Sequence, residues 1–195
     1  MLYTRKGDQG TTTTLRSRDR ISKSTQLIEV LGTVDELNSF IGLCAAMSQR
    51  NHNGNFSDLA EPLQEVQHML FVVQAELAGA PHKTLSQQHV DALENIVANI
   101  EKELRPITSF ILTGGSELSA LFDVTRTVAR RAERALVCAL IHEPSLVSQF
   151  TQAFMNRISS LFYAYARYIN QAEHIAEQAP RQPILTRFLS PENEQ

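Results

Sequence analysis

The segment LAEPLQEVQHMLFVVQAEL, residues 59–77, carries the clearest structural signal in the chain. Its apolar residues recur in alternating steps of four and three: Leu59, Leu63, Val66, Leu70, Val73 and Leu77. That spacing places all six on one face of an α-helix. The Gly-Ala-Pro sequence at residues 79–81 is expected to end the helix. The segment therefore predicts an amphipathic helix with one face buried in a helical core.

The same spacing recurs in four other segments. They run from Thr25 to the Asn- and Gly-rich break at 51–57, from the expected N-cap Ser86 to Pro106, from about residue 117 to 141, and from about residue 145 to 176. The expected core positions are Leu27, Leu31, Val34, Leu37, Ile41 and Cys44; Val90, Leu93, Ile96 or Val97, Ile100 and Leu104; Leu118, Leu121 or Phe122, Val128, Ala132, Leu136 and Leu140; and Phe150, Phe154, Ile158, Leu161 and Tyr165. No segment alternates strictly enough to predict a sheet. Five long amphipathic helices with short links predict an all-α five-helix bundle.

The length of 195 residues predicts one domain, 1–195. Residues 1–24 are polar, threonine-rich and basic and are expected to form a loop. Residues 25–176 would form the bundle, and the proline-containing segment 177–195 a tail. The net charge of −3 argues against a general nucleic-acid binder, because such domains are usually basic overall.

The N-terminal sequence MLYTRKGDQG lacks the apolar core of a signal peptide. No run approaches the roughly 18 apolar residues of a membrane span, so we expect a cytoplasmic protein with no membrane partner. Cys44 and Cys138 match no zinc or redox spacing and are expected to be buried free thiols.

The N-terminal loop has the composition of a phosphate-binding segment. Its cations are Arg5, Lys6, Arg16, Arg18, Arg20 and Lys23. Gly7 and Gly10 flank an expected turn, and four threonines follow at 11–14. Glycines let backbone N–H groups approach an anion, and hydroxyls and cations add donors. The Walker A pattern is absent, and a solvated basic arm is the alternative.

The fourth predicted helix contains RTVARRAER, residues 126–134. Arg126, Arg130 and Arg134 recur every four residues, with Glu133 on the same face and Arg131 about a quarter-turn away. A guanidinium can donate two hydrogen bonds to one phosphate. Because a single acid accompanies four arginines, a triphosphate clamp is favoured over an ordinary charged face.

Two further helix faces are polar: Asp35, Asn38, Ser39 and Gly42 on the first helix, and Asn156, Ser160, Tyr163 and Arg167 on the fifth. Asp and Asn are poor residues for helix interiors, so these faces predict contact with another subunit or a ligand; a solvent face is the alternative. Glu65 and His68 fit the E-x-x-H pattern of di-iron bundles, but no second copy exists. The arginine helix could also enter an RNA groove, but it lacks a neighbouring aromatic stacking platform.

Five stretches together resemble the PduO-type ATP:cob(I)alamin adenosyltransferases. They are YTRKGDQGT at 3–11, GTVDELN at 32–38, FILTGG at 110–115, RTVARRAER at 126–134 and NRIS at 156–159. They occur in the family's order and cover residues 3 to about 170. The arginine stretch and TVDELN are the most distinctive.

The resemblance implies a five-helix bundle that assembles as a homotrimer with active sites between subunits. It implies transfer of the 5′-deoxyadenosyl group of ATP to the cobalt of a reduced corrinoid, cob(I)alamin or cob(I)yrinic acid a,c-diamide, with release of triphosphate. ATP, Mg²⁺ and cobalamin are the expected small molecules. The sequence has no flavin or iron–sulfur motif, so a flavoprotein reductase is expected to supply Co(I), and a B12-dependent enzyme to use the product.

The family's site residues carry over to matching positions. The N-terminal loop would bind ATP with Mg²⁺ through Thr4, Arg5, Lys6, Gly7, Thr12, Thr13 and Lys23. The arginine segment would add Arg130, Arg131, Glu133 and Arg134, joined by Asn156. Asp35 resembles the aspartate that pairs with Arg126 across the subunit boundary, and Phe110 resembles the phenylalanine that presses on the lower face of the corrin. Arg126, Arg130, Asp35 and Phe110 are the expected catalytic residues, and we expect no metal ion held by protein side chains alone.

The chain departs from the family pattern at four places. Thr113 stands where proline is usual, Ser160 where aspartate is usual, and Phe122 where a histidine is often found. Arg16 and Ser17 lie near usual glycines, in a loop one residue longer. A second hypothesis is therefore a non-catalytic ATP- or cobalamin-binding bundle, a sensor or carrier. A third is a purely structural helical oligomer.

Overall fold

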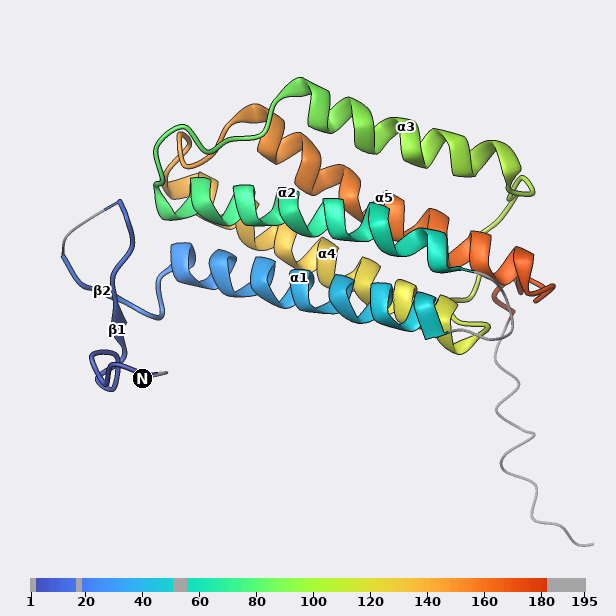
Figure 1. Cartoon of the computed structure of the whole chain (residues 1–195), viewed down its shortest axis with the longest axis horizontal. Coiled ribbons are helices and arrows are strands. Elements are labelled where there is room, and N and C mark those ends of the chain that lie inside the picture. Colours follow the sequence, from blue (N-terminus) through green and yellow to red (C-terminus); the bar gives the residue numbers. More distant parts are fainter. Residues whose placement is uncertain (1–2, 17–18, 51–55, 182–195) are drawn as a thin grey trace, which may run out of the picture.

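The computed structural model describes residues 3–16, 19–50 and 56–181, and within them five α-helices form a bundle (Figure 1). The helices are α1 (Gln26–Arg50), α2 (Ala60–Ala78), α3 (Gln87–Glu103), α4 (Glu117–His142) and α5 (Gln149–Ala172). A single 3₁₀ turn, η1 (Ser57–Leu59), precedes α2. Arg18 of the basic loop and the tail beyond Arg181 lie outside the described residues. The expected all-α five-helix bundle is confirmed.

The order of packing explains which helix faces are buried. α1 packs against α2 and α4, α4 packs against α5, and α3 covers α5 from the outside. The apolar stripe of α2 is buried as predicted, from Leu63 to Leu77. On α3 only Val90 and Leu93 are fully buried, because this helix meets the rest of the bundle on one narrow side.

Aromatic side chains fill the contact between α4 and α5. The rings of Phe122 and Tyr165 lie edge to face with centroids 5.6 Å apart, and Phe162 lies 6.3 Å from Phe122. Phe122 and Phe162 are fully buried. Burying one such side chain stabilises the fold by roughly 1.5–3 kcal/mol. Phe122 is therefore a core residue, and not part of any ligand site.

Serine caps begin three of the helices. Ser86 starts α3 as expected, and its backbone N–H donates to Nδ1 of His89 at 3.1 Å. The Oγ atoms of Ser116 and Ser148 accept from the backbone N–H groups three residues on, each at 3.2 Å. The Ser148 cap places the start of α5 at Gln149, later than the predicted position near Ser145, and α5 also ends before Ala176.

The N-terminal loop is more ordered than its sequence suggested. Strand β1 (Thr11–Thr12) pairs antiparallel with β2 (Ile21–Ser22). The prediction of a segment without strands was wrong here, because backbone pairing of two residues needs no alternating pattern. Cys138 was also predicted wrongly: it is exposed on α4, whereas Cys44 is buried.

Helix α1 is long and apolar enough, by length and composition, to cross a membrane. Its apolar residues instead supply one wall of the bundle core, among them Val30, Leu37 and Ile41, none of which is exposed. The composition of α1 therefore follows from its central position between α2 and α4.

Candidate active site

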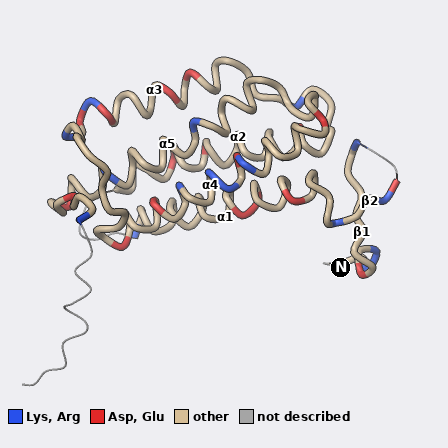
Figure 2. The backbone as a smooth tube through the Cα atoms, turned by 180° about the vertical axis from the view of Figure 1, so that it is seen from behind, with Lys and Arg blue, Asp and Glu red and all other residues tan. Residues whose placement is uncertain are grey.

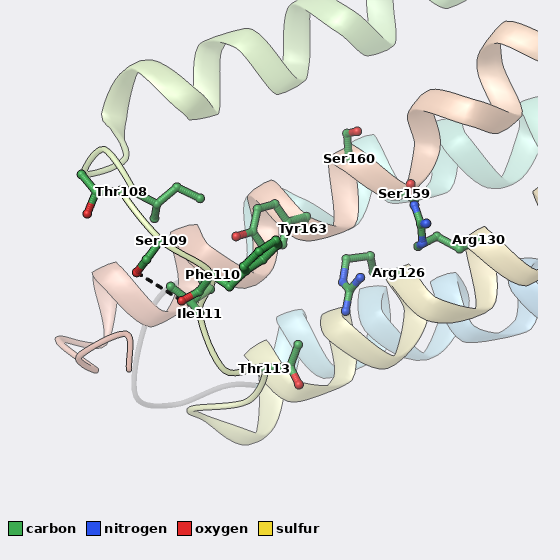
Figure 3. A pocket seen from close by; sticks show the side chains of 11 residues that line it. Thr108, Ser109, Phe110, Ile111, Thr113, Arg126, Arg130, Ser159, Ser160 and Tyr163 are labelled. Atoms are coloured by element: carbon green, nitrogen blue, oxygen red, sulfur yellow. Dashed lines mark hydrogen bonds between the residues drawn. The ribbon is translucent and has the colours of Figure 1, made fainter. Parts of the chain in front are cut away.

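A groove of about 890 Å³ opens between α4, α5 and the connection that joins α3 to α4 (Figure 3). The connection supplies Ile107, Thr108, Ser109, Phe110, Ile111 and Thr113, α4 supplies Arg126 and Arg130, and α5 supplies Ser159, Ser160 and Tyr163. These residues are apolar, hydroxyl-bearing or cationic, and no carboxylate is among them. The groove is thus suited to a large, mostly neutral ligand next to an anion.

Phe110 is the most exposed large hydrophobic side chain in the described structure, at 89 %. Figure 3 shows its ring pointing from the connection toward Tyr163, with Arg126 across from it on α4. An apolar ring held at the mouth of a groove, with Ile107 and Leu112 also exposed nearby, is typical of a surface that a ligand covers. Burial raises the pKa of Tyr163, and its phenol O–H is available as a donor to such a ligand.

The glycine turn that follows Phe110 is fixed by two buried polar side chains. Asp123 accepts from the backbone N–H of Gly114 at 3.0 Å, and Asn170 donates to the carbonyl of Gly114 at 2.8 Å. Gly115 has φ +117°, and a Cβ there would lie 2.2 Å from Oδ1 of Asn170. The connection therefore has one fixed path into α4, and that path holds Phe110 over the groove.

Arg126 forms an ion pair with Asp123, with Nε and Oδ1 3.2 Å apart. Asp35, the partner expected from a neighbouring subunit, is exposed on α1, where Nε2 of Gln74 approaches it at 3.5 Å. Asp123 thus both fixes the glycine turn and orients Arg126.

The four arginines of α4 between residues 126 and 134 do not all lie on one side of the helix. Figure 2 shows its basic positions gathered along the middle of α4. Arg130 lines the groove, and Nη1 of the exposed Arg134 donates to the carbonyl of Arg130 at 3.2 Å. Glu133 accepts from Nδ2 of Asn156 on α5 at 2.6 Å. Arg131 turns to the other side and pairs with Glu36 of α1, in agreement with the quarter-turn expected from its position.

The N-terminal loop is organised by its own cations. Arg20 donates from Nε to Oγ1 of Thr11 at 2.8 Å and from Nη2 to the Thr11 carbonyl at 2.7 Å. Lys23 donates from Nζ to the carbonyl of Gly7 at 3.1 Å, and a Cβ on Gly7 would lie 2.9 Å from that Nζ. Thr4, Arg5 and Lys6 are exposed at the turn.

A second groove, of about 410 Å³, lies where this loop meets the bundle. It is lined by Thr12, Thr13, Thr14, Leu15, Lys23, Ile28, Leu31 and Ala78. Three of these, Thr12, Thr13 and Lys23, are among the predicted ATP-binding residues. An apolar floor next to hydroxyls and an ammonium suits a flat heterocycle attached to an anionic group.

The two grooves lie towards opposite ends of the bundle. The N-terminal loop projects where α1 begins, whereas the connection carrying Phe110 lies at the other end, where α4 begins (Figure 1). In a single chain, the structure therefore brings Phe110, Arg126 and Arg130 together in the larger groove, and it pairs Glu133 of α4 with Asn156 of α5. It does not bring the loop residues to them.

The family model described as cobalamin adenosyltransferase matches residues 2–169. The chain belongs to the cobalamin adenosyltransferase family.

Relatives in this family cover most of the chain. A corrinoid adenosyltransferase from Bacillus subtilis is 35 % identical over 179 residues, which span 90 % of both chains. The corrinoid adenosyltransferase PduO of Salmonella typhimurium is 37 % identical over 90 % of this chain and 51 % of its own length. A solved variant of a PduO-type ATP:corrinoid adenosyltransferase from Lactobacillus reuteri, complexed with cobalamin and ATP, has a TM-score of 0.83 at 32 % identity. The match covers 93 % of this chain and 100 % of the Lactobacillus reuteri chain.

Two residues of the polar faces predicted on the first and fifth helices, Asn38 and Arg167, are buried within the bundle. Arg167 is buried, pairs with Glu177 at 2.7 Å and donates to the carbonyl of Arg105 at 2.7 Å, so the expected ligand or subunit contact is wrong for this residue. Asn38 is also buried. Its backbone carbonyl accepts from Nε2 of Gln67 of α2 at 3.0 Å, whereas its side-chain Oδ1 has no hydrogen-bond partner within the described residues.

Asp123 and Asn170 are the site-forming residues that sequence reasoning missed. Both lie inside helices, where Asp and Asn are unfavourable unless their side chains bond elsewhere. That signal was available, but the partner, a glycine turn at 114–115, was visible only in the structure.

Proposed function

We propose that this protein transfers the 5′-deoxyadenosyl group of ATP to the cobalt of cob(I)alamin, forming adenosylcobalamin and releasing triphosphate. The observation that carries the proposal is the groove in which Phe110 stands opposite Arg126 and Arg130. The similar Lactobacillus reuteri enzyme, solved with cobalamin and ATP, supports the same pair of ligands here.

The corrinoid would occupy the larger groove. A corrin ring is flat and apolar, with amide groups at its rim, and the groove offers two aromatic rings, Phe110 and Tyr163, and six side chains with a hydroxyl group, Tyr163 among them. Phe110 would press on the lower face of the ring, keeping water and the lower axial base away from cobalt. A cobalt ion without that ligand is easier to reduce to Co(I).

The reaction needs no protein nucleophile. The Co(I) electron pair attacks C5′ of ATP, a Co–C bond forms, the C5′–O bond breaks, and triphosphate leaves with the bonding electrons. Cobalt is formally oxidised to Co(III). Arg130 and Arg134 would stabilise the charge that develops on the leaving group, and binding would place C5′ close to cobalt.

ATP would bind mainly through the N-terminal loop, at Thr4, Arg5, Lys6, Gly7, Thr12, Thr13 and Lys23. Arg130, Arg131, Glu133, Arg134 and Asn156 would complete the site. Among the described residues no group of three or more metal-ligating side chains is found. Mg²⁺ typically binds nucleotides through phosphates and one or two carboxylates, and the single carboxylate Glu133 fits that requirement.

We infer a homotrimer with active sites between subunits, because the loop and the α4–α5 groove lie apart within one chain. Asp35, exposed on α1, would then pair with Arg126 of a neighbouring subunit. We further propose one domain over residues 1–195, a cytoplasmic location, a separate flavoprotein reductase that supplies Co(I), and a B12-dependent enzyme that uses the product.

The direct test is an anaerobic assay with ATP and chemically reduced cobalamin. We expect a light-sensitive Co–C product and stoichiometric triphosphate, and the Arg130→Ala variant should lose most of this activity. Absence of the Co–C product with the wild-type protein would overturn the proposal.

A non-catalytic sensor or carrier is the second candidate. Thr113 and Ser160 differ from the usual family residues, and both line the larger groove. Calorimetry separates the two functions. Tight binding of ATP and cobalamin without turnover would favour the sensor or carrier.

A further inference from the structure

The N-terminal loop, described over residues 3–16 and 19–24, continues directly into α1. Its strands pair with each other, and the loop projects past the end of the helices (Figure 1). Binding through an unfixed loop is weakened, because ordering the loop costs conformational entropy. A loop that binds a nucleotide therefore benefits from an anchor on the bundle.

Arg16 makes the contacts expected of such an anchor. It lies between β1 and β2 in the chain, yet its side chain bonds to the bundle. Nε donates to the carbonyl of Leu77 at 2.8 Å, and Nη2 donates to the carbonyls of Glu76 at 3.1 Å and Leu146 at 2.5 Å. Nη1 pairs with Glu143 at 3.0 Å. One guanidinium thus joins the loop to the end of α2 and to the link between α4 and α5.

The end of α2 is shaped to receive this side chain. The last carbonyls of a helix lack intrahelical partners and carry partial negative charge, so a cation bonded to them is favourable. Gly79 ends α2 with φ +87°, and a Cβ there would lie 2.3 Å from Cγ of Arg16. Glycine at this position both permits the left-handed turn and leaves room for Arg16.

The anchor is next to the smaller groove. Leu15, the residue before Arg16, and Ala78, the residue after Leu77, both line it. One wall of the groove belongs to the loop and the other to α1 and α2, and Arg16 joins the two walls. Its contacts therefore fix the width of this groove, which is lined by Thr12, Thr13 and Lys23 of the proposed ATP site.

We propose that Arg16 is a positioning residue for ATP: it touches no substrate, and holds the nucleotide loop against the end of α2. The inference rests on the proposed binding of ATP to this loop. Of the loop's cations, Lys23 bonds within the loop to Gly7, whereas Arg16 bonds to α2 and to the α4–α5 link.

The test compares Arg16→Ala, Arg16→Lys and Glu143→Gln in the full chain. For Arg16→Ala we expect the KM for ATP to rise about tenfold, with the KM for cobalamin and the kcat at saturating ATP changed less than about twofold. Arg16→Lys should be intermediate, because an ammonium cannot reach all of the acceptors at once. Glu143→Gln should have a small effect, since the backbone acceptors remain.

Calorimetry with ATP alone, without cobalamin, keeps this result independent of turnover, and thermal unfolding reports whether each variant is folded. If Arg16→Ala does not fold, the inference is tested by the other two variants: an intermediate effect of Arg16→Lys and a small effect of Glu143→Gln are then the expected results. An unchanged KM for ATP, an equal rise of both KM values, or a Glu143→Gln effect as large as that of Arg16→Ala would overturn the inference. A wild-type protein that binds ATP but forms no Co–C bond would contradict the proposed function alone.

Discussion

At the scale of single residues, the path of the Phe110 connection depends on two adjacent glycines with different surroundings. Both have strongly positive φ values, +114° at Gly114 and +117° at Gly115. A Cβ on Gly114 would meet nothing within 4 Å, whereas one on Gly115 would collide with the side chain of Asn170. The pair therefore separates the cost of backbone strain from the cost of a steric clash.

We expect Gly114→Ala to lower the free energy of unfolding by about 1–2 kcal/mol, from strain alone. Gly115→Ala should cost about 2–4 kcal/mol, because Asn170 must also move. It should also reduce adenosylation more strongly, since the displaced turn carries Phe110. Urea unfolding and the anaerobic assay measure both effects, and equal costs for the two variants would contradict this interpretation.

The buried thiol of Cys44 makes stability depend on alkaline pH. Burial raises its pKa to about 11, despite the hydrogen bond with Oγ1 of Thr125 at 3.1 Å. A thiol whose pKa is raised in the folded state stabilises that state below the unfolded pKa of 9.0, and this contribution is lost as pH rises from 9 to about 11.

We therefore expect wild-type protein to lose up to about 2–3 kcal/mol over that pH range from this thiol. The Cys44→Ala variant should be less stable at pH 8 because of the lost side chain, yet show a smaller decline towards pH 11. Denaturation at several pH values tests the difference. Burial raises the pKa of Tyr165 to about 12. Because Tyr165 is present in both proteins, its titration does not contribute to the difference between them.

At the scale of helices, Glu76 joins the end of α2 to the start of α5. Its carboxylate accepts from the backbone N–H of Ser148 at 2.7 Å, from Oγ1 of Thr151 at 2.5 Å and from Oγ1 of Thr84 at 2.8 Å. An anion bonded to the first N–H groups of a helix satisfies donors that otherwise lack partners. Helix α5 is therefore positioned by a residue 72 positions earlier in the chain.

We expect Glu76→Ala to lower the free energy of unfolding by about 2–4 kcal/mol, because three donors lose a charged acceptor. Glu61→Ala is the matched control, since Glu61 is an exposed residue in the first turn of the same helix. Chemical denaturation of both variants gives the comparison. Equal stabilities would contradict the role assigned to Glu76.

At the scale of the whole molecule, the separation of the N-terminal loop from the α4–α5 groove has a direct consequence for activity. If each site combines the loop of one subunit with the α4–α5 groove of another, variants with complementary defects restore sites when mixed. Lys23→Ala damages the loop, and Arg130→Ala damages the groove.

An equal mixture of the two variants, unfolded and refolded together, should recover about one quarter of wild-type activity, because a random mixed oligomer pairs an intact loop with an intact groove at about that frequency. Each variant refolded alone is the control and should stay nearly inactive. No recovery in a mixture shown to be trimeric would place each complete site within one chain.

The sequence by itself determined the helices and which residues of α4 carry its positive charge. Helical periodicity and caps such as Ser86 depend on residues only a few positions apart, so they could be predicted. The quarter-turn that separates Arg131 from Arg130 followed from the same geometry. Five short motifs, which occur in the same order as in the family, predicted the family, and the comparisons confirmed it. The roles of Thr4, Lys23 and Asn156 at ATP stay predictions.

Only the tertiary structure decided which polar residues serve the fold. Arg16 looked like one more phosphate-binding cation, yet it bonds to the end of α2, and Arg167 looked like a ligand residue, yet it pairs with Glu177. Asp123 and Asn170 gained their roles from the glycine turn they hold. A side chain's partner is set by contacts between distant segments, and packing that joins α2, α4 and α5 cannot be deduced from local spacing.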